Sequence, residues 1–267
     1  MDHPTIRTVN VTRYVTPLRE GSSLPAIVEA DDDGLYVLKF RGAGQGIKAL
    51  IAELLAGEIA RALGLRVPEI VFATLDDALS RLEPDPEIRD LLHASAGLNL
   101  GLDYLPGSIT FTPLAETVDP GLASQIVWFD CLVTNVDRTP RNANLLVWHK
   151  NIWMIDHGAS LYFHHAWHNW EVYGHRPFVQ VKDHILLPFA SKLEEANEEL
   201  RSRLTPDILR SIVALIPDPW LEELAMVQGG GLTADGIRQV YGAVLKERLA
   251  VSGTFAKEAQ HARQGRV

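Results

Sequence analysis

The stretch from Trp128 to Phe163 reads WFDCLVTNVDRTPRNANLLVWHKNIWMIDHGASLYF and combines a helix end, a polar loop and two short apolar runs. The apolar runs, 145–147 and 152–155, flank a short polar turn, a pattern that predicts a β-hairpin. Because a hairpin returns the chain to its starting point, we expect Asp156 to lie beside Asn142. The fold of this segment therefore determines whether its polar side chains converge.

The polar residues at the open end of this hairpin suit phosphoryl transfer. Asp137 precedes Asn142 at the spacing D-x-x-x-x-N, and Asp156 begins a D-x-G turn that ends at Gly158. Asn142 and Asp156 offer the hard oxygen atoms that Mg²⁺ prefers, and Asp137 is a candidate base for an attacking hydroxyl. Asp and Asn are also common turn residues, so each one alone fits an ordinary turn. The joint pattern at both ends of one hairpin favours a site.

The segments NVDRTPRNANLLV and MIDHGASL resemble the catalytic region of the HipA-like kinases and of the related phosphatidylinositol 3- and 4-kinases. The resemblance implies an α+β, two-lobe protein-kinase-like fold, with ATP as the phosphoryl donor and Mg²⁺ as the metal. It implies that Asp137 is the catalytic aspartate and that Asn142 and Asp156 are the Mg²⁺ ligands. His157 stands where ordinary protein kinases carry the Phe of D-F-G, and no H-R pair precedes Asp137, so the atypical branch is favoured.

The resemblance covers roughly residues 35–163 and implies a division of the chain into lobes. We expect a small N-lobe over residues 1–101, with an antiparallel sheet and one long helix. A hinge over residues 102–107 would join it to a larger, mainly helical C-lobe over residues 108–267.

Three short strands are predicted at the start of the chain. Residues 6–15 alternate weakly and read as an edge strand, and residues 26–30 and 35–40 flank an Asp33-Gly34 turn that favours a hairpin. Lys39 is the one charged residue in the third strand. Its amine must reach solvent, a ligand or a carboxylate, because burying it unpaired is costly. In the kinase plan this lysine is catalytic and binds the nucleotide phosphates; the alternative is an outward-facing strand lysine.

A strong helix is predicted over residues 47–63, where apolar residues recur with the helical period and Gly64 follows as a stop. Its segment AELLAGEIARALGLRVPEI resembles the corresponding helix of HipA-like kinases. In the kinase plan a glutamate of this helix pairs with the strand lysine. We assign Glu53 to that role, with Glu58 as the fallback. The alternative for Glu53 is a solvated helix charge.

Two further segments are assigned to nucleotide binding by the kinase plan. The loop residues Gly21, Ser22 and Ser23 occupy the position of the loop that covers the phosphates, although the G-x-G-x-x-G pattern is missing. Asp103, Tyr104 and Leu105 follow a predicted strand and are the hinge candidates, where backbone groups can bind the adenine edge. An ordinary surface turn and an ordinary strand end explain the same residues.

The composition limits the class of protein. Of the 267 residues 46% are hydrophobic, which is ample for a core. The formal net charge of −9 argues against nucleic acid as a partner. Cys131 is the only cysteine, so an intrachain disulfide and a cysteine metal cluster are excluded. No apolar run is long enough for a signal peptide or a membrane span, which makes a cytoplasmic protein the expectation.

Three function classes remain open at the level of sequence. An ATP-dependent kinase uses all the residues assigned above, and a nucleotide-binding pseudokinase or interaction module uses only some of them. A metal-dependent hydrolase would combine Asp137 and Asp156 with the close histidines His164, His165 and His168. That reading leaves the lysine strand and the glutamate helix without a role, so the kinase is favoured.

The acceptor of the phosphoryl group is the least determined feature. HipA-like relatives act on protein serine and the lipid-kinase relatives on inositol head groups, so the resemblance implies a hydroxyl acceptor of either kind or a small metabolite. We expect protein serine or threonine, because an acidic chain suits an anionic membrane substrate poorly. The sequence does not identify an antitoxin or another protein partner.

Overall fold

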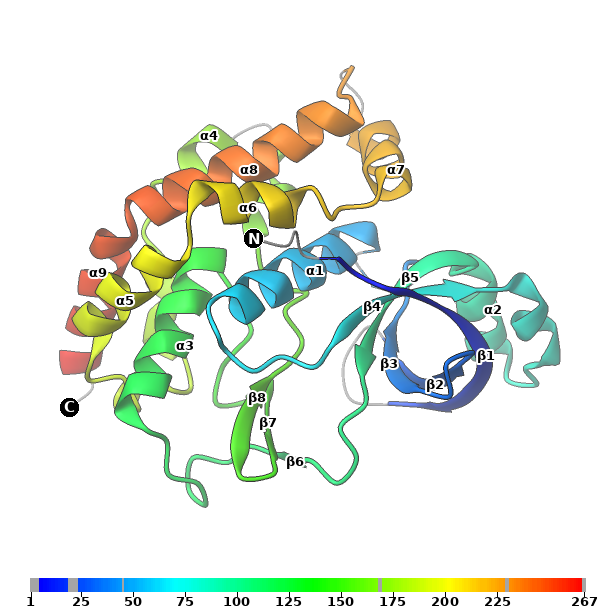
Figure 1. Cartoon of the computed structure of the whole chain (residues 1–267), viewed down its shortest axis with the longest axis horizontal. Coiled ribbons are helices and arrows are strands. Elements are labelled where there is room, and N and C mark those ends of the chain that lie inside the picture. Colours follow the sequence, from blue (N-terminus) through cyan, green and yellow to red (C-terminus); the bar gives the residue numbers. More distant parts are fainter. Residues whose placement is uncertain (1–4, 19–23, 45, 168–169, 229–230, 266–267) are drawn as a thin grey trace.

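The computed structural model describes residues 5–18, 24–44, 46–167, 170–228 and 231–265. It is an α+β structure in which a barrel lies at one end and helices fill the other (Figure 1). The barrel is closed, with strand order β1-β2-β3-β5-β4. Its strands are β1 (Thr8–Pro17), β2 (Ala26–Ala30), β3 (Leu35–Lys39), β4 (Ile70–Leu75) and β5 (Gly97–Asp103).

Closure of the barrel corrects the expected antiparallel sheet with residues 6–15 at its edge. Strand β1 pairs with β2 on one side and, in parallel, with β4 on the other, where Thr8 lies opposite Phe72. Irregularities in its register with β2 bend the strand, which allows one strand to contact both neighbours. Its buried valines, Val9 and Val11, belong to the apolar cluster inside the barrel. Pairing on both sides depends on tertiary structure, so alternation alone does not predict it.

Helix α1 (Ile47–Ala62) lies between the barrel and the C-terminal helices (Figure 1). Nearly every residue from Leu50 to Ala60 is buried, including Glu53 and Glu58. A helix that is covered on all sides has little amphipathic character, and α1 contacts strands β4 and β5 as well as helices α6 and α7. Gly64 follows its end with a φ of 83°, the left-handed conformation that glycine adopts without strain. The prediction for this helix is confirmed.

The hairpin predicted between Asn142 and Asp156 is present. Strand β7 (Leu145–Trp148) pairs antiparallel with β8 (Asn151–Met154), and β6 (Ile109–Thr110) adds a third strand. The two turn residues, His149 and Lys150, have positive φ angles, as a tight two-residue hairpin turn requires. The hairpin therefore brings the chain back at Met154 to a position opposite Leu145.

Helix α3 (Pro120–Val133) leads into the loop that precedes this hairpin. Asp119 accepts a hydrogen bond from the N–H of Leu122 and Pro120 occupies the first turn, so these two residues define the start of the helix. Cys131 is buried in α3, and burial raises the pKa of its thiol. Residue Thr134 ends the helix in a left-handed conformation.

The described residues include seven further α-helices, and all of these except α2 pack with α1 and α3 around the larger apolar cluster. They are α2 (Pro86–Ala94), α4 (Trp170–Tyr173), α5 (Leu193–Arg203), α6 (Pro206–Val213), α7 (Asp218–Gln228), α8 (Ala234–Ala250) and α9 (Ser252–Gln264). Of these, α2 stands apart beside the barrel (Figure 1). Among the described residues, no helix is both long and apolar enough to cross a membrane.

Helix α7 joins the barrel to the C-terminal helices. The indole N–H of Trp220 donates to the carbonyl of Leu98 at 3.1 Å, and its ring meets Phe72 edge-on at 5.7 Å. One turn further along α7, Glu223 forms an ion pair with Arg41, two residues after the end of β3. These contacts fix α7 to the same strands that carry the candidate lysine and the candidate hinge.

Candidate active site

Lys39 ends strand β3, and its side chain leaves the barrel toward the larger part of the molecule. Its Nζ lies 2.6 Å from Asp156 Oδ1 and 3.8 Å from Glu53 Oε2, with 13% of the side chain exposed. Burial lowers the pKa of the amine, but the charges of Glu53 and Asp156 outweigh burial, so the pKa of Lys39 is raised. Asp137 adds to this effect. Three carboxylates that were predicted to form the site therefore raise the pKa of one amine.

Glu53, rather than Glu58, is the glutamate of α1 that faces Lys39. Burial alone raises the pKa of Glu53, but Lys39 and then His157 outweigh it and hold this pKa at about 2. Glu58 instead pairs with Arg61 of its own helix at 3.1 Å. The position of Glu53 between a lysine and a histidine keeps it ionised although its side chain is only 1% exposed.

The loop after α3 brings Asp137 and Asn142 into contact. The Nδ2 group of Asn142 donates to Asp137 Oδ2 at 2.7 Å, and that of Asn144 donates to the same oxygen at 3.3 Å. The loop is closed at its base by two backbone hydrogen bonds between Thr139 and Asn142, at 2.9 and 3.1 Å. The five-residue spacing thus produces a tight loop with the aspartate and the asparagine on one side.

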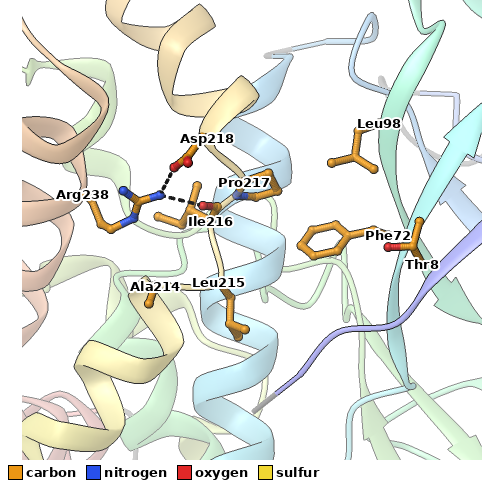
Figure 2. Close-up of a pocket in the computed structure, with 9 residues that line it drawn as sticks. All are labelled: Thr8, Phe72, Leu98, Ala214, Leu215, Ile216, Pro217, Asp218 and Arg238. Atoms are coloured by element: carbon orange, nitrogen blue, oxygen red, sulfur yellow. Dashed lines mark hydrogen bonds and ion pairs between the residues drawn. The ribbon is translucent and has the colours of Figure 1, made fainter. Parts of the chain in front are cut away.

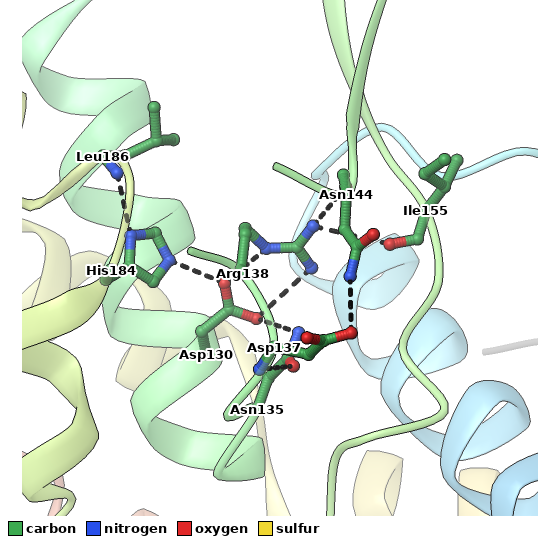
Figure 3. Close-up of polar contacts among 8 residues, drawn as sticks. All are labelled: Asp130, Asn135, Asp137, Arg138, Asn144, Ile155, His184 and Leu186. Carbon is green, nitrogen blue, oxygen red and sulfur yellow. Dashed lines mark hydrogen bonds and ion pairs between the residues drawn. The ribbon is translucent and has the colours of Figure 1, made fainter. Parts of the chain in front are cut away.

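A buried polar network holds this loop against helix α3 (Figure 3). Arg138 Nε donates to Asp130 Oδ2 at 2.6 Å, and His184 Nε2 lies 2.8 Å from the same oxygen. Burial alone raises the pKa of Asp130, but Arg138 and His184 outweigh it and hold this pKa far below its usual value. Arg138 thus pairs with a carboxylate of helix α3.

Arg138 also joins the loop to the open end of the hairpin, where β7 begins and β8 ends (Figure 3). Its Nη1 donates to the carbonyl of Asn144, and the N–H of Ile155 donates to that carbonyl at 3.1 Å. Asp156, the next residue, has a φ of 55° and turns toward Lys39. Arg138, which follows Asp137, and Ile155, which precedes Asp156, therefore donate to the same carbonyl, that of Asn144.

The network includes Asp130 and His184, which sequence reasoning missed. Asp130 stands alone among apolar residues of a predicted buried helix, and a buried charge needs a partner. That signal was available in the sequence; Arg138 is eight residues away along the chain, whereas the second partner, His184, is distant. His184 offers no local pattern, because only the fold brings residues 130 and 184 together.

The two segments assigned to nucleotide binding have different outcomes. Gly21, Ser22 and Ser23 lie outside the described residues. At the hinge, the N–H groups of Asp103 and Tyr104 donate to the carbonyls of Glu69 and Leu35, at 2.8 and 2.9 Å. These two N–H groups are therefore engaged within the barrel, and Leu105 is buried. A role of this segment in adenine binding stays a prediction.

Of the close histidines that the structure describes, His164 lies in the core and His165 is exposed. His164 is buried, its Nδ1 lies 3.1 Å from the hydroxyl of Tyr241, and burial holds its pKa well below the usual value. His168 lies outside the described residues. Within the described ranges, no three His, Cys, Asp or Glu side chains are grouped as a set of metal ligands.

A pocket of about 630 Å³ lies away from these residues, between the barrel and the α6–α7 connection (Figure 2). Its one arginine, Arg238, donates to Asp218 at 2.6 Å and to the carbonyl of Ile216 at 3.0 Å. Its lining consists of Thr8, Phe72, Leu98, Ala214, Leu215, Ile216, Pro217, Asp218 and Arg238. None of the predicted site residues lines it.

A model of the HipA-like kinase family matches residues 11–248. The chain belongs to this family. The resemblance inferred from the sequence is thereby confirmed, and this HipA-like kinase is a phosphotransferase. No curated protein sequence matches it.

Solved structures of other kinases resemble this HipA-like kinase. The Helicobacter pylori proinflammatory kinase CtkA has a TM-score of 0.55 at 14% identity, over 96% of this chain and 98% of that one. Golgi casein kinase has a TM-score of 0.46 at 12% identity, over 97% and 72% of the two chains. Its structure with Mn/ADP bound has a TM-score of 0.43 at 12% identity, over 91% and 72%. The likeness to CtkA supports the kinase-like fold.

Proposed function

We propose that this HipA-like kinase transfers the γ-phosphoryl group of ATP to a serine or threonine hydroxyl of a protein. The observation that carries the proposal is the contact of Lys39 with Asp156 and Glu53, at 2.6 and 3.8 Å. The three residues come from a barrel strand, from the turn after β8 and from helix α1. Phosphoryl transfer needs this combination of a phosphate-binding amine, its orienting carboxylate and a metal-binding carboxylate.

The residues around Asp156 fit a magnesium ion by their chemistry. Asp156 and Asn142 offer a carboxylate and an amide oxygen, which are the hard donors that Mg²⁺ prefers. Asn142 precedes the hairpin and Asp156 follows it, and the hairpin strands pair in register from Leu145 to Trp148. We assign both as the metal ligands. Bound Mg²⁺ and ATP would supply charge neutralisation and the phosphoryl group.

The roles of the other residues follow from their contacts. Lys39 binds phosphate oxygens, and Glu53 keeps the amine pointing toward them. Asp137 takes the proton of the acceptor hydroxyl. Asn142 and Asn144 both donate to its Oδ2 atom, so we assign proton acceptance to Oδ1.

The nucleotide would lie between two lobes, residues 1–101 and 108–267. The loop with Gly21, Ser22 and Ser23 would cover the phosphates. The segment Asp103 to Leu105, within the hinge 102–107, would bind the adenine edge through backbone groups other than the two N–H groups already engaged. These assignments rest on the kinase plan rather than on contacts in the structure.

The acceptor follows from charge and family. A net charge of −9 repels anionic membranes and favours a polypeptide hydroxyl over an inositol head group. Incubating the protein with radiolabelled ATP, Mg²⁺ and a cell extract tests the assignment, because the labelled species can be separated into protein, lipid and small-molecule fractions. Label in the lipid or metabolite fraction alone would contradict it.

Binding and transfer are tested separately. We expect Mg²⁺-dependent stabilisation of the fold by ATP in a thermal shift assay, and weaker stabilisation in Asp156→Asn, which loses a charged ligand. Stabilisation by ATP without any labelled product would identify a pseudokinase. No stabilisation at any Mg²⁺ concentration would contradict nucleotide binding itself.

A further inference from the structure

His157, the residue after the proposed metal ligand, makes a contact that the kinase plan does not include. Its side chain is fully buried, and its Nδ1 lies 3.3 Å from Oε1 of Glu53. The edge of its ring packs against Phe129 of helix α3, with centroids 5.8 Å apart. A histidine thus occupies the position between α1, α3 and the Asp156 turn.

The direction of this hydrogen bond follows from the charge of Glu53. A carboxylate that pairs with Lys39 is ionised and can only accept a hydrogen bond, so Nδ1 of His157 is the donor in this contact. The other carboxylate oxygen, Oε2, makes no hydrogen bond with the described residues and lies 3.8 Å from Lys39. The side chain and the backbone N–H of His157 both hydrogen-bond to the Glu53 carboxylate, so His157 fixes the rotation of this group.

The turn that carries His157 lies close to helix α1. A Cβ atom placed on Gly158 would be 3.6 Å from the Cβ of Ala49 and 3.7 Å from Oε2 of Glu53. A side chain at position 158 would therefore reach helix α1 beside the hydrogen bond, so the turn lies close to this part of the helix. A shift of α1 along its axis would break the bond and move Glu53 away from Lys39 at the same time.

We infer that His157 is a positioning residue that ties Glu53 of α1 to the turn bearing Asp156, so that the phosphate-binding lysine and the metal ligand are held in register. The inference rests on the proposed ATP-dependent function. In an ordinary D-F-G turn the phenylalanine contacts its surroundings only by packing, whereas His157 adds a directed hydrogen bond to a buried charge. Hydrogen bonds to a charged group contribute more to stability than those between neutral groups, because a buried carboxylate without donors is unfavourable.

The test measures the Kd of ATP with Mg²⁺ by isothermal titration calorimetry. We expect His157→Phe to bind about 10- to 100-fold more weakly, the range for losing a hydrogen bond to a charged group. His157→Asn keeps a donor near the position of Nδ1 and is expected to bind within about threefold of the unaltered protein, on the scale of a weak change in one contact. Equal weakening in both variants would overturn the inference.

A double-mutant cycle tests whether His157 acts through Glu53. If it does, adding His157→Phe to a Glu53→Gln protein changes the Kd little, since the acceptor charge is already gone. Effects that simply multiply would show that His157 acts independently of Glu53. His164→Phe is the matched control at another buried histidine and is expected to lower the Tm while leaving the Kd unchanged.

Three further outcomes are decisive. If His157→Phe does not fold, His157→Gln replaces it, because its donor lies nearer the Nε2 position; wild-type binding by this variant overturns the inference. If the unaltered protein does not bind ATP with Mg²⁺, the proposed function fails and takes the inference with it. Wild-type binding together with an unaffected His157→Phe variant removes the inference alone.

Discussion

Asp137 is the residue on which the proposed chemistry depends most directly. We expect Asp137→Asn to lower the rate of phosphoryl transfer by about 10²- to 10⁴-fold, the range for losing a positioned proton acceptor. The Kd of ATP should change little, because Asp137 is not assigned to nucleotide binding. Single-turnover kinetics with radiolabelled ATP measure the transfer step. An unchanged rate would remove Asp137 from the mechanism.

Glu53 gives the fold a specific dependence on pH. Its pKa is lowered from the usual 4.5 to about 2, so the ionised form stabilises the folded state above the usual pKa. This contribution is lost as the pH falls from about 4.5 toward 2. We expect Glu53→Gln to flatten the dependence of unfolding free energy on pH in this window, as measured by urea unfolding.

The control for this pH effect is Glu198→Gln on helix α5, where the glutamate is exposed. We expect this variant to show the same dependence of unfolding free energy on pH as the unaltered protein. Equal slopes for the unaltered protein and Glu53→Gln would show that the Glu53 carboxyl group contributes nothing to acid sensitivity.

At the scale of elements, the buried network attaches the loop of Asp137 to helix α3. Removing one partner of a buried ion pair leaves an uncompensated charge and costs about 3–5 kcal/mol. We expect Arg138→Met to lower the free energy of unfolding by this amount in urea titrations, because the side chains of Arg138 and Asp130 are both fully buried.

The matched control is Arg210→Met on helix α6. Its ion pair with Asp207 is between side chains that are 76% and 78% exposed, and such pairs contribute about 0–1 kcal/mol. A similar cost for Arg138→Met and Arg210→Met would contradict the structural role of the network.

The elements themselves were largely predictable. Helical periodicity located α1, and the alternation of two apolar runs with a polar turn located the hairpin β7–β8. Both signals are local, because each element has a periodic pattern within its own residues. The contact of Lys39 with Glu53 followed only from the family plan, because nothing local distinguishes Glu53 from Glu58 on a fully buried helix.

Contacts between distant parts of the chain were not predictable in the same way. The parallel pairing of β1 with β4 and the meeting of Asp130 with His184 join residues more than fifty positions apart. Such pairings are selected by the packing of the whole fold. The hydrogen bond from His157 to Glu53 belongs to this class as well, although both residues lie in segments that the sequence had already assigned.

At the scale of the molecule, Trp220 connects the barrel to the C-terminal helices. Its side chain is fully buried, so Trp220→Ala should lower the free energy of unfolding by about 3–5 kcal/mol. Trp220→Phe keeps part of the ring packing on Phe72 but loses the hydrogen bond to Leu98 and leaves a small cavity, for about 1–3 kcal/mol. Urea unfolding measures both. Equal losses would show that packing contributes little to this junction.

The only cysteine is buried, so cysteines introduced elsewhere can be labelled selectively to measure motion of the barrel relative to the C-terminal helices. Thiol-reactive probes need an accessible thiolate, and Cys131 in α3 offers neither exposure nor easy ionisation. Cysteines introduced at Leu82 beside the barrel and Leu114 after β6, which are 80% and 98% exposed, would therefore take spin labels selectively in the otherwise unaltered chain. Pulsed electron resonance on that doubly labelled protein would then report, as a distribution of distances, how far nucleotide draws the barrel toward the helices.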